Sequence, residues 1–283
     1  MKNLHVFYEK EHPVLQNIHF SVKKGEWVGI LGVNGSGKST LLQWLMGLLS
    51  AKDGQLVYQG AKKHAHERMC QDMALVVQNP EDQFIGVTVR DDIAFGLEND
   101  NIPTINMRQR VEEALQWVEM ESYGDLPPHQ LSGGQKQRVA LAGALVRKKP
   151  ILLLDEATAM LDPIGRSTWL ALLKKMQIQM KQTILSVTHD MEEVHYAHKI
   201  LVLYHGRQLY FGPPLAFFEN DALFQESGLI RPFSVEMRKY LTEAGVAEAV
   251  SILKELGWTN ETVSYTHLRA HETYLSKSNT ICT

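Results

Sequence analysis

The sequence predicts an α/β fold with a mainly parallel sheet, because short apolar runs alternate with helical segments and one run stops at a glycine-rich loop. The apolar run at 27–31 is too short for a helix and ends at Gly32, as is typical of a buried strand that enters a tight loop. Further strands are expected at 74–77, 151–154 and 183–187. Strands that alternate with helices form sheets covered on both faces.

The remaining elements follow from periodicity. Alternating apolar and polar residues predict a strand-rich opening up to about Gly60. Apolar residues at helical spacing predict helices at 41–49, 107–120, 133–146 and 167–180. After Pro213 and Pro214 the pattern changes to short helical stretches, expected at 215–218, 235–244 and 247–256.

Composition places the chain among ordinary folded proteins. Its 283 residues, 44% hydrophobic and 22% charged, suit one large domain with an appendage or two small ones. The net charge is −3 without a basic stripe, so no nucleic-acid partner is expected. No apolar run approaches the ~20 residues of a membrane-spanning helix, and residues 1–5 lack the apolar core of a secretory signal. Two cysteines, Cys70 and Cys282, are too few for a disulfide framework, so a reducing cytosol fits best.

The loop after the strand at 27–31 has the sequence of a phosphate-binding loop. Residues 32–39 read Gly-Val-Asn-Gly-Ser-Gly-Lys-Ser and match G-x-x-x-x-G-K-[ST] between a predicted strand and a predicted helix. Inward-pointing backbone amides and the positive N-terminal end of the helix would bind phosphate oxygens. Lys38 is expected to bridge the β- and γ-phosphates, and the Ser39 hydroxyl to bind Mg²⁺. The alternative is a glycine-rich structural turn.

Two acids close the apolar strand predicted at 151–154. In a parallel sheet, ligands bind beyond the carboxyl ends of the strands, where Asp155 and Glu156 fall. Asp155 is expected to hold Mg²⁺, directly or through water. Glu156 can reach a water in line with the γ-phosphate and act as a general base. An acidic turn after a strand is the plainer alternative.

A second glycine-rich helix start carries a family resemblance. Residues 131–135 read Leu-Ser-Gly-Gly-Gln and are followed by Lys-Gln-Arg, which resembles the hallmark of the ATP-binding cassette (ABC) ATPases. The Ser132 hydroxyl and the neighbouring backbone amides are free to bind an anion. The resemblance implies that they serve the nucleotide of a second subunit, so that two chains enclose two ATP molecules. A serine N-cap followed by flexible glycines also describes this segment.

Other positions match the family one at a time. Tyr8 resembles the aromatic residue that stacks on adenine, and Gln78 the glutamine that senses Mg²⁺ and the attacking water. Asp162 resembles the aspartate that crosses the dimer interface, and His189 the histidine that contacts the γ-phosphate. Each has a structural alternative: a strand tyrosine, a loop glutamine, a turn-forming Asp-Pro pair and a surface histidine.

The resemblance covers about residues 3–215 and implies a complete site. Catalytic roles are expected for Glu156, His189, Gln78 and Lys38, and Mg²⁺ contacts for Ser39, Gln78 and Asp155. The expected nucleotide-binding residues are Tyr8, Gly32, Asn34, Gly35, Ser36, Gly37, Lys38, Ser39, Thr40, Ser132, Gly133, Gly134, Gln135 and Asp162. The cofactors are therefore expected to be ATP and Mg²⁺.

The resemblance also implies the domain organisation. The expected fold is an α/β P-loop NTPase cassette of the ABC ATPase type at 1–215, with antiparallel N-terminal strands and a helical subdomain at about 79–146. A small C-terminal helical extension is expected at 216–262. Residues 263–283 are rich in Ser, Thr and His and are expected to be a non-native or disordered tail.

Segments beside the motifs indicate the branch. The stretches 78–84, 88–96, 155–163 and 229–233 are similar to those of energy-coupling factor ATPases, which serve importers of vitamins and of cobalt or nickel. The chain would then be an ATP-hydrolysing motor, peripheral at the cytoplasmic face of the cell membrane. Its partners would be a second ABC ATPase subunit, a copy or a paralogue, a transmembrane coupling subunit and a substrate-binding membrane subunit.

The resemblance implies that the segment after Gln78 lies beside those membrane subunits. Its acidic residues (Glu81, Asp82, Asp91 and Asp92) and apolar residues (Phe84, Ile85 and Val87) would suit a basic, amphipathic helix of the partner. A plain acidic, solvated loop is the alternative. Three alternatives to this function stay open. Another ABC importer or exporter branch would share the motifs. A soluble ABC ATPase of DNA repair or translation would carry a long coiled coil or a second cassette. A P-loop kinase or other NTPase would have no use for residues 131–135.

Overall fold

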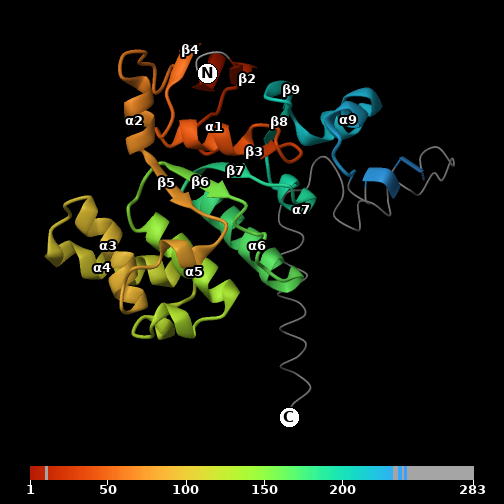
Figure 1. Cartoon of the computed structure of the whole chain (residues 1–283). Helices are drawn as coiled ribbons and strands as arrows, with labels where there is room; N and C mark the ends of the chain where they lie inside the picture. Colours follow the sequence, from red (N-terminus) through yellow and green to blue (C-terminus); the bar gives the residue numbers. More distant parts are fainter. Residues whose placement is uncertain (10–11, 232–234, 238, 241–283) are drawn as a thin grey trace. The chain divides into compact units, whose positions relative to one another are not determined.

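The computed structural model describes residues 1–9, 12–231, 235–237 and 239–240 (Figure 1). They belong to two compact units that divide between Pro214 and Leu215. The strands are β1 (Lys2–Glu9), β2 (His12–Ile18), β3 (Trp27–Leu31), β4 (Ala51–Gln55), β5 (Met73–Val76), β6 (Ile151–Asp155), β7 (Thr183–Val187), β8 (Lys199–Tyr204) and β9 (Arg207–Gly212). The longer helices are α1 (Lys38–Leu45), α2 (Ala65–Gln71), α3 (Val89–Asn99), α4 (Thr104–Trp117), α5 (Gly133–Leu145), α6 (Pro163–Gln179) and α9 (Asp221–Ser227), and the short ones are α7 (Met191–Val194) and α8 (Pro214–Phe218).

Within the described residues, the strands form one mixed sheet in the order β4-β1-β2-β9-β8-β3-β7-β6-β5. Strands β8, β3, β7, β6 and β5 run parallel to one another, whereas β1 pairs antiparallel with β2 and β4. The predicted α/β cassette, with a parallel core and antiparallel N-terminal strands, is therefore confirmed. Since β3 lies beside β7 and β7 beside β6, the loops that follow these three strands emerge at one edge.

The core lies between the sheet and its helices. The burial of β3 is complete along its length, and β6 and β7 are almost as deeply buried. The apolar side chains of α1, among them Leu41 and Leu45, pack into the same cluster as Val28 and Ile30 of β3. This packing fixes the direction in which α1 leaves the loop at 32–39.

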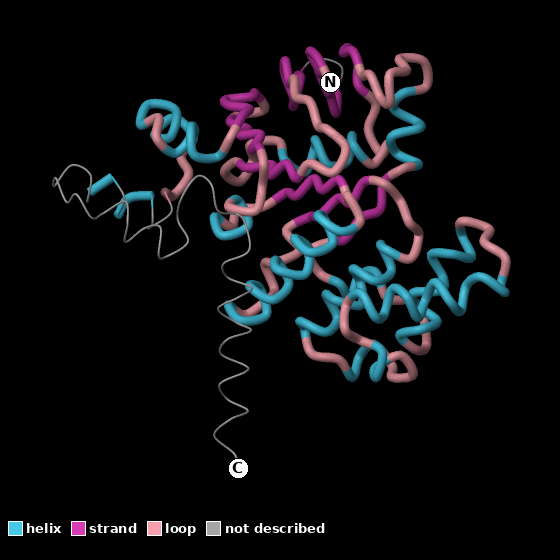
Figure 2. The backbone as a smooth tube through the Cα atoms, turned by 180° about the vertical axis from the view of Figure 1, so that it is seen from behind, coloured by secondary structure: helices cyan, strands magenta, loops and turns pink. Residues whose placement is uncertain are grey.

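Helices α3, α4 and α5 form a group that packs mainly on itself and contacts β5 through α5. Figures 1 and 2 show this group on the side of the sheet away from β1, β2 and β4. Two of the three helices begin at capping boxes, formed by Thr88 with Asp91 and by Ser132 with Gln135. The predicted helical subdomain at 79–146 spans these helices.

Several boundaries differ from the sequence predictions. The helix expected at 167–180 begins earlier, at Pro163, because Asp162 caps it and proline suits the first helical turn. The helix expected at 107–120 ends at Trp117, and Glu119 takes a positive φ of 58°. The helix expected at 41–49 ends at Leu45, which leaves Leu48 exposed.

Helices α2 and α3 and strands β8 and β9 were not expected individually. The run at 200–203 in β8 is fully buried and as apolar as the run at 151–154 in β6, so length and hydropathy could have identified this strand.

The second unit contains the short helices after Pro214. In it, the rings of Phe217, Phe218 and Phe224 pack together, and Arg231 lies over the Phe224 ring while pairing with Asp221 at 2.7 Å. The expected helix at 247–256 and tail at 263–283 fall outside the described residues. Of the helix expected at 235–244, residues 235–237 and 239–240 are described and are helical, and the other half falls outside the described residues. The domain boundaries therefore stay predictions.

Candidate functional site

Three loops meet at the carboxyl edge of the parallel strands. The backbone N–H of Glu156, after β6, donates to Val187 O of β7 at 2.9 Å. The N–H of Thr188, after β7, donates to Ile30 O of β3 at 3.1 Å. These bonds continue the sheet for one residue beyond β6 and β7, so the loops that carry the predicted phosphate-binding, acidic and histidine residues leave the sheet at one level.

The loop at 32–39 wraps tightly between β3 and α1. Ser36 N donates to Val33 O at 3.1 Å, and Ser36 O accepts from Gly206 N of the β8–β9 turn at 3.0 Å. Above Gly35, whose φ is +77°, no other group lies within 4 Å of where a Cβ would stand. Asn34, Gly35 and Ser39 are exposed, whereas Ser36 and Lys38 are buried. The loop is therefore held by the β8–β9 turn on one side and is open to solvent on the other, at Asn34 and Gly35.

Lys38 is held inside this loop. Its Nζ donates to Gly32 O at 2.7 Å and to Val33 O at 3.2 Å. Burial lowers the pKa of Lys38, while the charges of Glu156 and Asp155 favour its protonated form. A cation fixed in a loop of glycines is suited to phosphate oxygens.

Asp155 and Glu156 end β6 beside that cation. Burial raises the pKa of the Asp155 carboxyl, the charge of Glu156 raises it further, and Lys38 opposes both. The backbone of Glu156 has a positive φ of 45°, uncommon for a residue other than glycine. Glu156 also accepts a backbone bond from Ala159 N at 2.9 Å, which closes the turn that follows.

Glu156 faces His189 across the edge of the sheet. His189 Nδ1 lies 3.4 Å from Glu156 Oε2. The Glu156 side chain is 22% exposed and that of His189 is 63% exposed, so the pair borders solvent. A carboxylate and an imidazole at this distance, next to a phosphate-binding loop, can orient a water and accept its proton.

The predicted second anion site begins α5. Ser132 and Gln135 form a reciprocal capping box, with Ser132 N donating to Gln135 Oε1 at 2.8 Å. A Cβ added to Gly133 would lie 4.0 Å from Met160 O, so the backbone there has open space beside it. Ser132 and Gly133 are exposed. The segment is thus both a helix cap and an open surface near Asp162, which caps α6 by accepting from Gly165 N at 2.6 Å.

Gln78 lies exposed after β5, and its backbone O accepts from Gln137 Nε2 at 3.4 Å. Tyr8 lies in β1, but its side chain is outside what the structure describes. Every other predicted site residue is described, and the three loops place Lys38, Asp155, Glu156 and His189 together. Their roles stay predictions.

The residues present fit Mg²⁺ bound together with a phosphate rather than a bare metal ion. Among the described residues, no cluster of three or more His, Cys, Asp or Glu side chains could hold a metal. Mg²⁺ usually takes one or two protein carboxylates and completes its shell with phosphates and water. Asp155 and the exposed Ser39 could supply such oxygens, and the buried Ser36 hydroxyl has no hydrogen-bonding partner among the described residues.

Sequence reasoning missed Gln137 and Gly206. Gln137 is fully buried, and its Nε2 donates to Ala157 O at 2.5 Å and to Val77 O at 3.4 Å. It thereby joins α5 to the chain on either side of the site. Its place two residues after the family pentapeptide was the one available signal.

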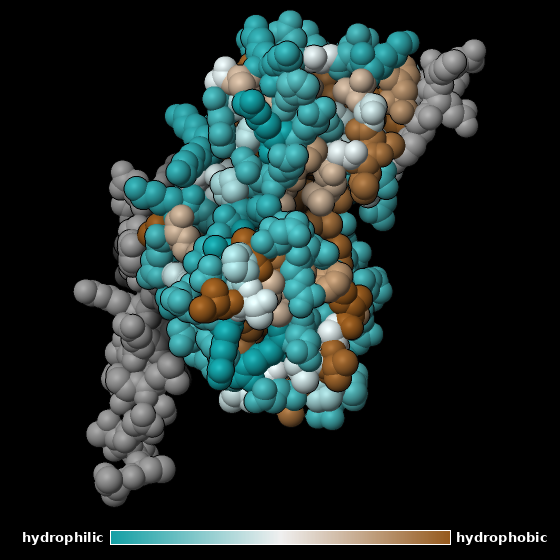
Figure 3. All heavy atoms as spheres, turned by 90° about the vertical axis from the view of Figure 1, so that its left-hand side faces the viewer, coloured by the Kyte–Doolittle hydropathy of each residue, from teal (hydrophilic) through white to brown (hydrophobic). Residues whose placement is uncertain are grey.

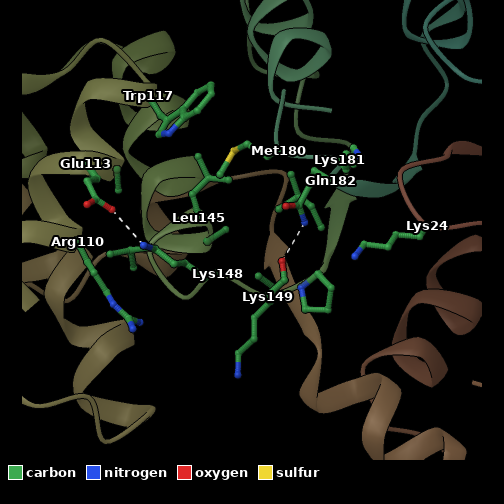
Figure 4. A pocket seen from close by; sticks show the side chains of 16 residues that line it. Lys24, Arg110, Glu113, Trp117, Leu145, Lys148, Lys149, Met180, Lys181 and Gln182 are labelled. Atoms are coloured by element: carbon green, nitrogen blue, oxygen red, sulfur yellow. Dashed lines mark hydrogen bonds and ion pairs between the residues drawn. The ribbon is translucent and has the colours of Figure 1, made fainter. Parts of the chain in front are cut away.

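A cavity of about 390 Å³ lies elsewhere, between the sheet and helices α4 and α5 (Figure 4). Its basic lining includes Lys24, Arg110 and Lys149. Its lining also includes Pro150 and Gln182, at the amino ends of β6 and β7. Because Glu156 and His189 follow the carboxyl ends of these strands, the cavity is separate from the site.

Comparisons with known proteins agree on one family. The family model described as "ABC transporter" matches residues 15–159. The chain is 42% identical over 258 residues to the energy-coupling factor transporter ATP-binding protein EcfA1 of Bacillus licheniformis, covering 90% of this chain and 92% of that protein. It is 43% identical over 249 residues to EcfA1 of Streptococcus mutans, with coverage of 87% and 89%.

Solved structures give the same result. The structure of cbiO1 from Clostridium perfringens, described as part of the ABC transporter complex cbiONQ, is similar with a TM-score of 0.72 and 34% identity, over 79% of this chain and 91% of that one. A dimeric post-hydrolysis state of the ATP-binding cassette MJ0796 bound to ADP and Pi is similar with a TM-score of 0.65 and 29% identity, over 75% and 97%.

Proposed function

Because this chain belongs to the ABC transporter family, and within it to the energy-coupling factor transporter ATP-binding proteins, we propose that it is the ATP-hydrolysing motor of a micronutrient importer. The observation that carries the proposal is the Glu156–His189 pair, 3.4 Å apart beside the loop of Lys38. The cargo we propose is a vitamin or a cobalt or nickel ion, as the resemblance to the energy-coupling factor ATPases implies.

The chemistry of the site follows from where its groups lie. The amides of residues 32–39 and the Lys38 ammonium bind the phosphates, for which Lys38 exchanges its bonds to Gly32 O and Val33 O. Asp155, Ser39 and Gln78 would hold Mg²⁺, which would neutralise charge on the phosphate oxygens. Tyr8 stacks on the adenine.

In the proposed hydrolytic step, Glu156 accepts a proton from the attacking water. A water held between Glu156 and His189 attacks the γ-phosphorus, the Glu156 carboxylate takes one of its protons, and the bond from the γ-phosphorus to the ADP oxygen breaks. His189 hydrogen bonds the γ-phosphate oxygens.

A second cassette completes each site. The exposed start of α5 presents the Ser132 hydroxyl and the backbone amides of Gly133 and Gly134, which could bind the γ-phosphate of a nucleotide held by the other subunit. Asp162 lies near this surface and would cross the same interface. Dimeric MJ0796 cassettes support this arrangement, in which the partner is a copy or a paralogue.

The membrane partners are proposed from the family. Among the described residues, we find no helix that is both long and apolar enough to span a membrane. From the family, we assign membrane crossing to a coupling subunit and a substrate-binding subunit, with this chain peripheral at the cytoplasmic face. Figure 3 shows that the face over α2, α3 and α4 is mainly hydrophilic with small separate hydrophobic patches, which suits docking at a defined point.

The segment between Gln78 and α3 is the proposed docking point. Ile85 and Val87 are 62% and 79% exposed, although Asp92 Oδ1 holds their loop by accepting from Ile85 N at 2.8 Å. The neighbouring acids are already engaged, since Glu81 pairs with Lys136 and Asp82 accepts from Asn79 at 3.0 Å. Apolar contact therefore contributes more here than free charge.

The test is a double substitution, Ile85→Glu with Val87→Glu. ATP binding by the purified chain should stay at the wild-type level, whereas co-purification with the membrane subunits and uptake into vesicles should be lost. The matched control is Ile105→Glu, an 88% exposed residue on α4, which should change neither. Wild-type complex yield and uptake in the double variant would show that docking occurs elsewhere.

A further inference from the structure

Glu193 is a buried acid that the proposed mechanism does not use. It lies on α7, directly after the loop that carries His189, and is only 2% exposed. Buried carboxylates are rare unless they are paired or hydrogen-bonded. In the described residues around it, the contacts are hydroxyl groups from two different loops rather than a cation.

The contacts come from both sides of the site. Thr158 Oγ1 lies 3.4 Å from Glu193 Oε2, within hydrogen-bonding distance and buried. The hydroxyl-bearing side chains of Ser186, in β7, and Thr188, directly after it, also interact with the carboxyl and lower its pKa. Glu193 Oε1 has no bond of good geometry among the described residues.

The Ser186 and Thr188 hydroxyls can each donate their hydrogen to Glu193, because their oxygens already accept hydrogen bonds from other groups. Ser186 Oγ accepts from the Trp27 indole N–H at 2.8 Å, and Thr188 Oγ1 accepts from Asp190 N at 2.9 Å. Each hydroxyl has one hydrogen to donate. Since the acceptor sides are already used by Trp27 and Asp190, the hydrogens are available for the Glu193 carboxyl.

The pKa of Glu193 reflects both its burial and the polar groups around it. Burial, together with the negative charge of Asp190, raises the pKa of Glu193 to about 7, even though the hydroxyls of Ser186, Thr188 and Thr158 act to lower it. Asp190 itself lies 3.3 Å from the Arg166 guanidinium of α6.

We propose that Glu193 is a positioning residue that sets the spacing of Glu156 and His189 by holding together the two loops that carry them. Thr158 is two residues beyond Glu156, in the turn closed by the bond from Ala159 N to Glu156 O. Thr188 directly precedes His189. Loss of the Glu193 carboxyl releases both loops, and a misplacement of about 1 Å in a reacting geometry can cost about 100-fold in rate.

The test uses Glu193→Ala and Glu193→Gln in the full chain with its partner subunits. Glu193→Ala is expected to lower kcat for ATP hydrolysis at least about tenfold while KM for ATP changes less than about twofold, because the phosphate loop is untouched. Glu193→Gln is expected to keep kcat within about threefold, since the amide oxygen accepts the same hydroxyls. The matched control is Gln182→Ala, a buried side chain at the amino end of β7 that donates to Lys149 O at 3.0 Å.

A double-mutant cycle separates positioning from general stability. With His189→Ala already present, adding Glu193→Ala should lower kcat less than about threefold further, because the two act through one arrangement. The proposal would be overturned if the kcat losses of His189→Ala and Glu193→Ala multiplied in the double variant. It would also be overturned if Gln182→Ala lost as much kcat as Glu193→Ala, or if Glu193→Gln and Glu193→Ala lost equal kcat. If Glu193→Ala does not fold, Thr158→Val removes one of the two loop contacts and should lower kcat without raising KM; unchanged kcat would overturn it.

This inference rests on the proposed roles of Glu156 and His189, so Glu156→Gln is assayed alongside. Full turnover in Glu156→Gln would mean that the proposed hydrolytic role fails. Lost turnover in Glu156→Gln with full turnover in Glu193→Ala would refute the role of Glu193 alone.

Discussion

Gly206 supports the phosphate loop from below, and its replacement by alanine should destabilise the chain and its nucleotide site together. Gly206 has a φ of +74°, and a Cβ there would lie 2.1 Å from Val14 O, a backbone atom that cannot rotate away. Its N–H donates to Ser36 O at 3.0 Å, and its carbonyl accepts from Gln16 N at 2.8 Å.

The magnitude follows from these contacts. The left-handed backbone costs about 1 kcal/mol for alanine, and displacing the turn weakens two backbone hydrogen bonds worth about 1 kcal/mol each. A total of about 3 kcal/mol lowers the melting temperature by about 6–12 °C in a domain of this size. Because Ser36 O loses its anchor, KM for ATP should also rise.

Thermal unfolding followed by circular dichroism measures the first effect, and initial rates across ATP concentrations measure the second. Gly60→Ala is the matched control, since Gly60 has a φ of +80° with no atom within 4 Å of the Cβ position. Strain alone should cost this control about 1 kcal/mol, or about 2–4 °C. Equal losses in the two variants would refute the close-approach argument.

Two further predictions concern charge. Lys38→Ala should weaken ATP binding measured by calorimetry, because the cation at the phosphate loop is lost; unchanged affinity would contradict its role. Because the folded-state pKa of Glu193 is raised to about 7 from an unfolded value of 4.5, the native state binds the extra proton, so stability should fall as pH rises from about 5 to about 7. The urea unfolding midpoint of the wild type should therefore fall between about pH 5 and about pH 7, whereas that of Glu193→Gln should not. An equal fall in both proteins would show that another group titrates.

The sequence predicted what depends on local pattern. The loop at 32–39 and the acids after β6 follow strong short motifs, and the order of β3, β7 and β6 brought them to one edge as expected. The start of α6 at Pro163 was also readable from Asp162 and the proline after it, although apolar periodicity alone placed it later.

Residues that act through tertiary contacts were not predictable in the same way. Glu193 and Gly206 belong to no motif, and Gln137 only follows one. Their partners lie far away in the chain: Ala157 for Gln137, Thr158 for Glu193 and Ser36 for Gly206. Their importance depends on burial and on which loops meet, which one sequence does not specify.

The most direct test of the account is the rate of phosphate release by Glu156→Gln compared with its ATP affinity. The amide keeps the shape of the carboxylate but cannot take the proton from water, so ATP binding should be retained while turnover falls by about 10²–10⁴. The variant should also accumulate as a closed, ATP-bound dimer. Phosphate release within tenfold of the wild type, at equal ATP occupancy, would contradict the assignment of Glu156 as the base.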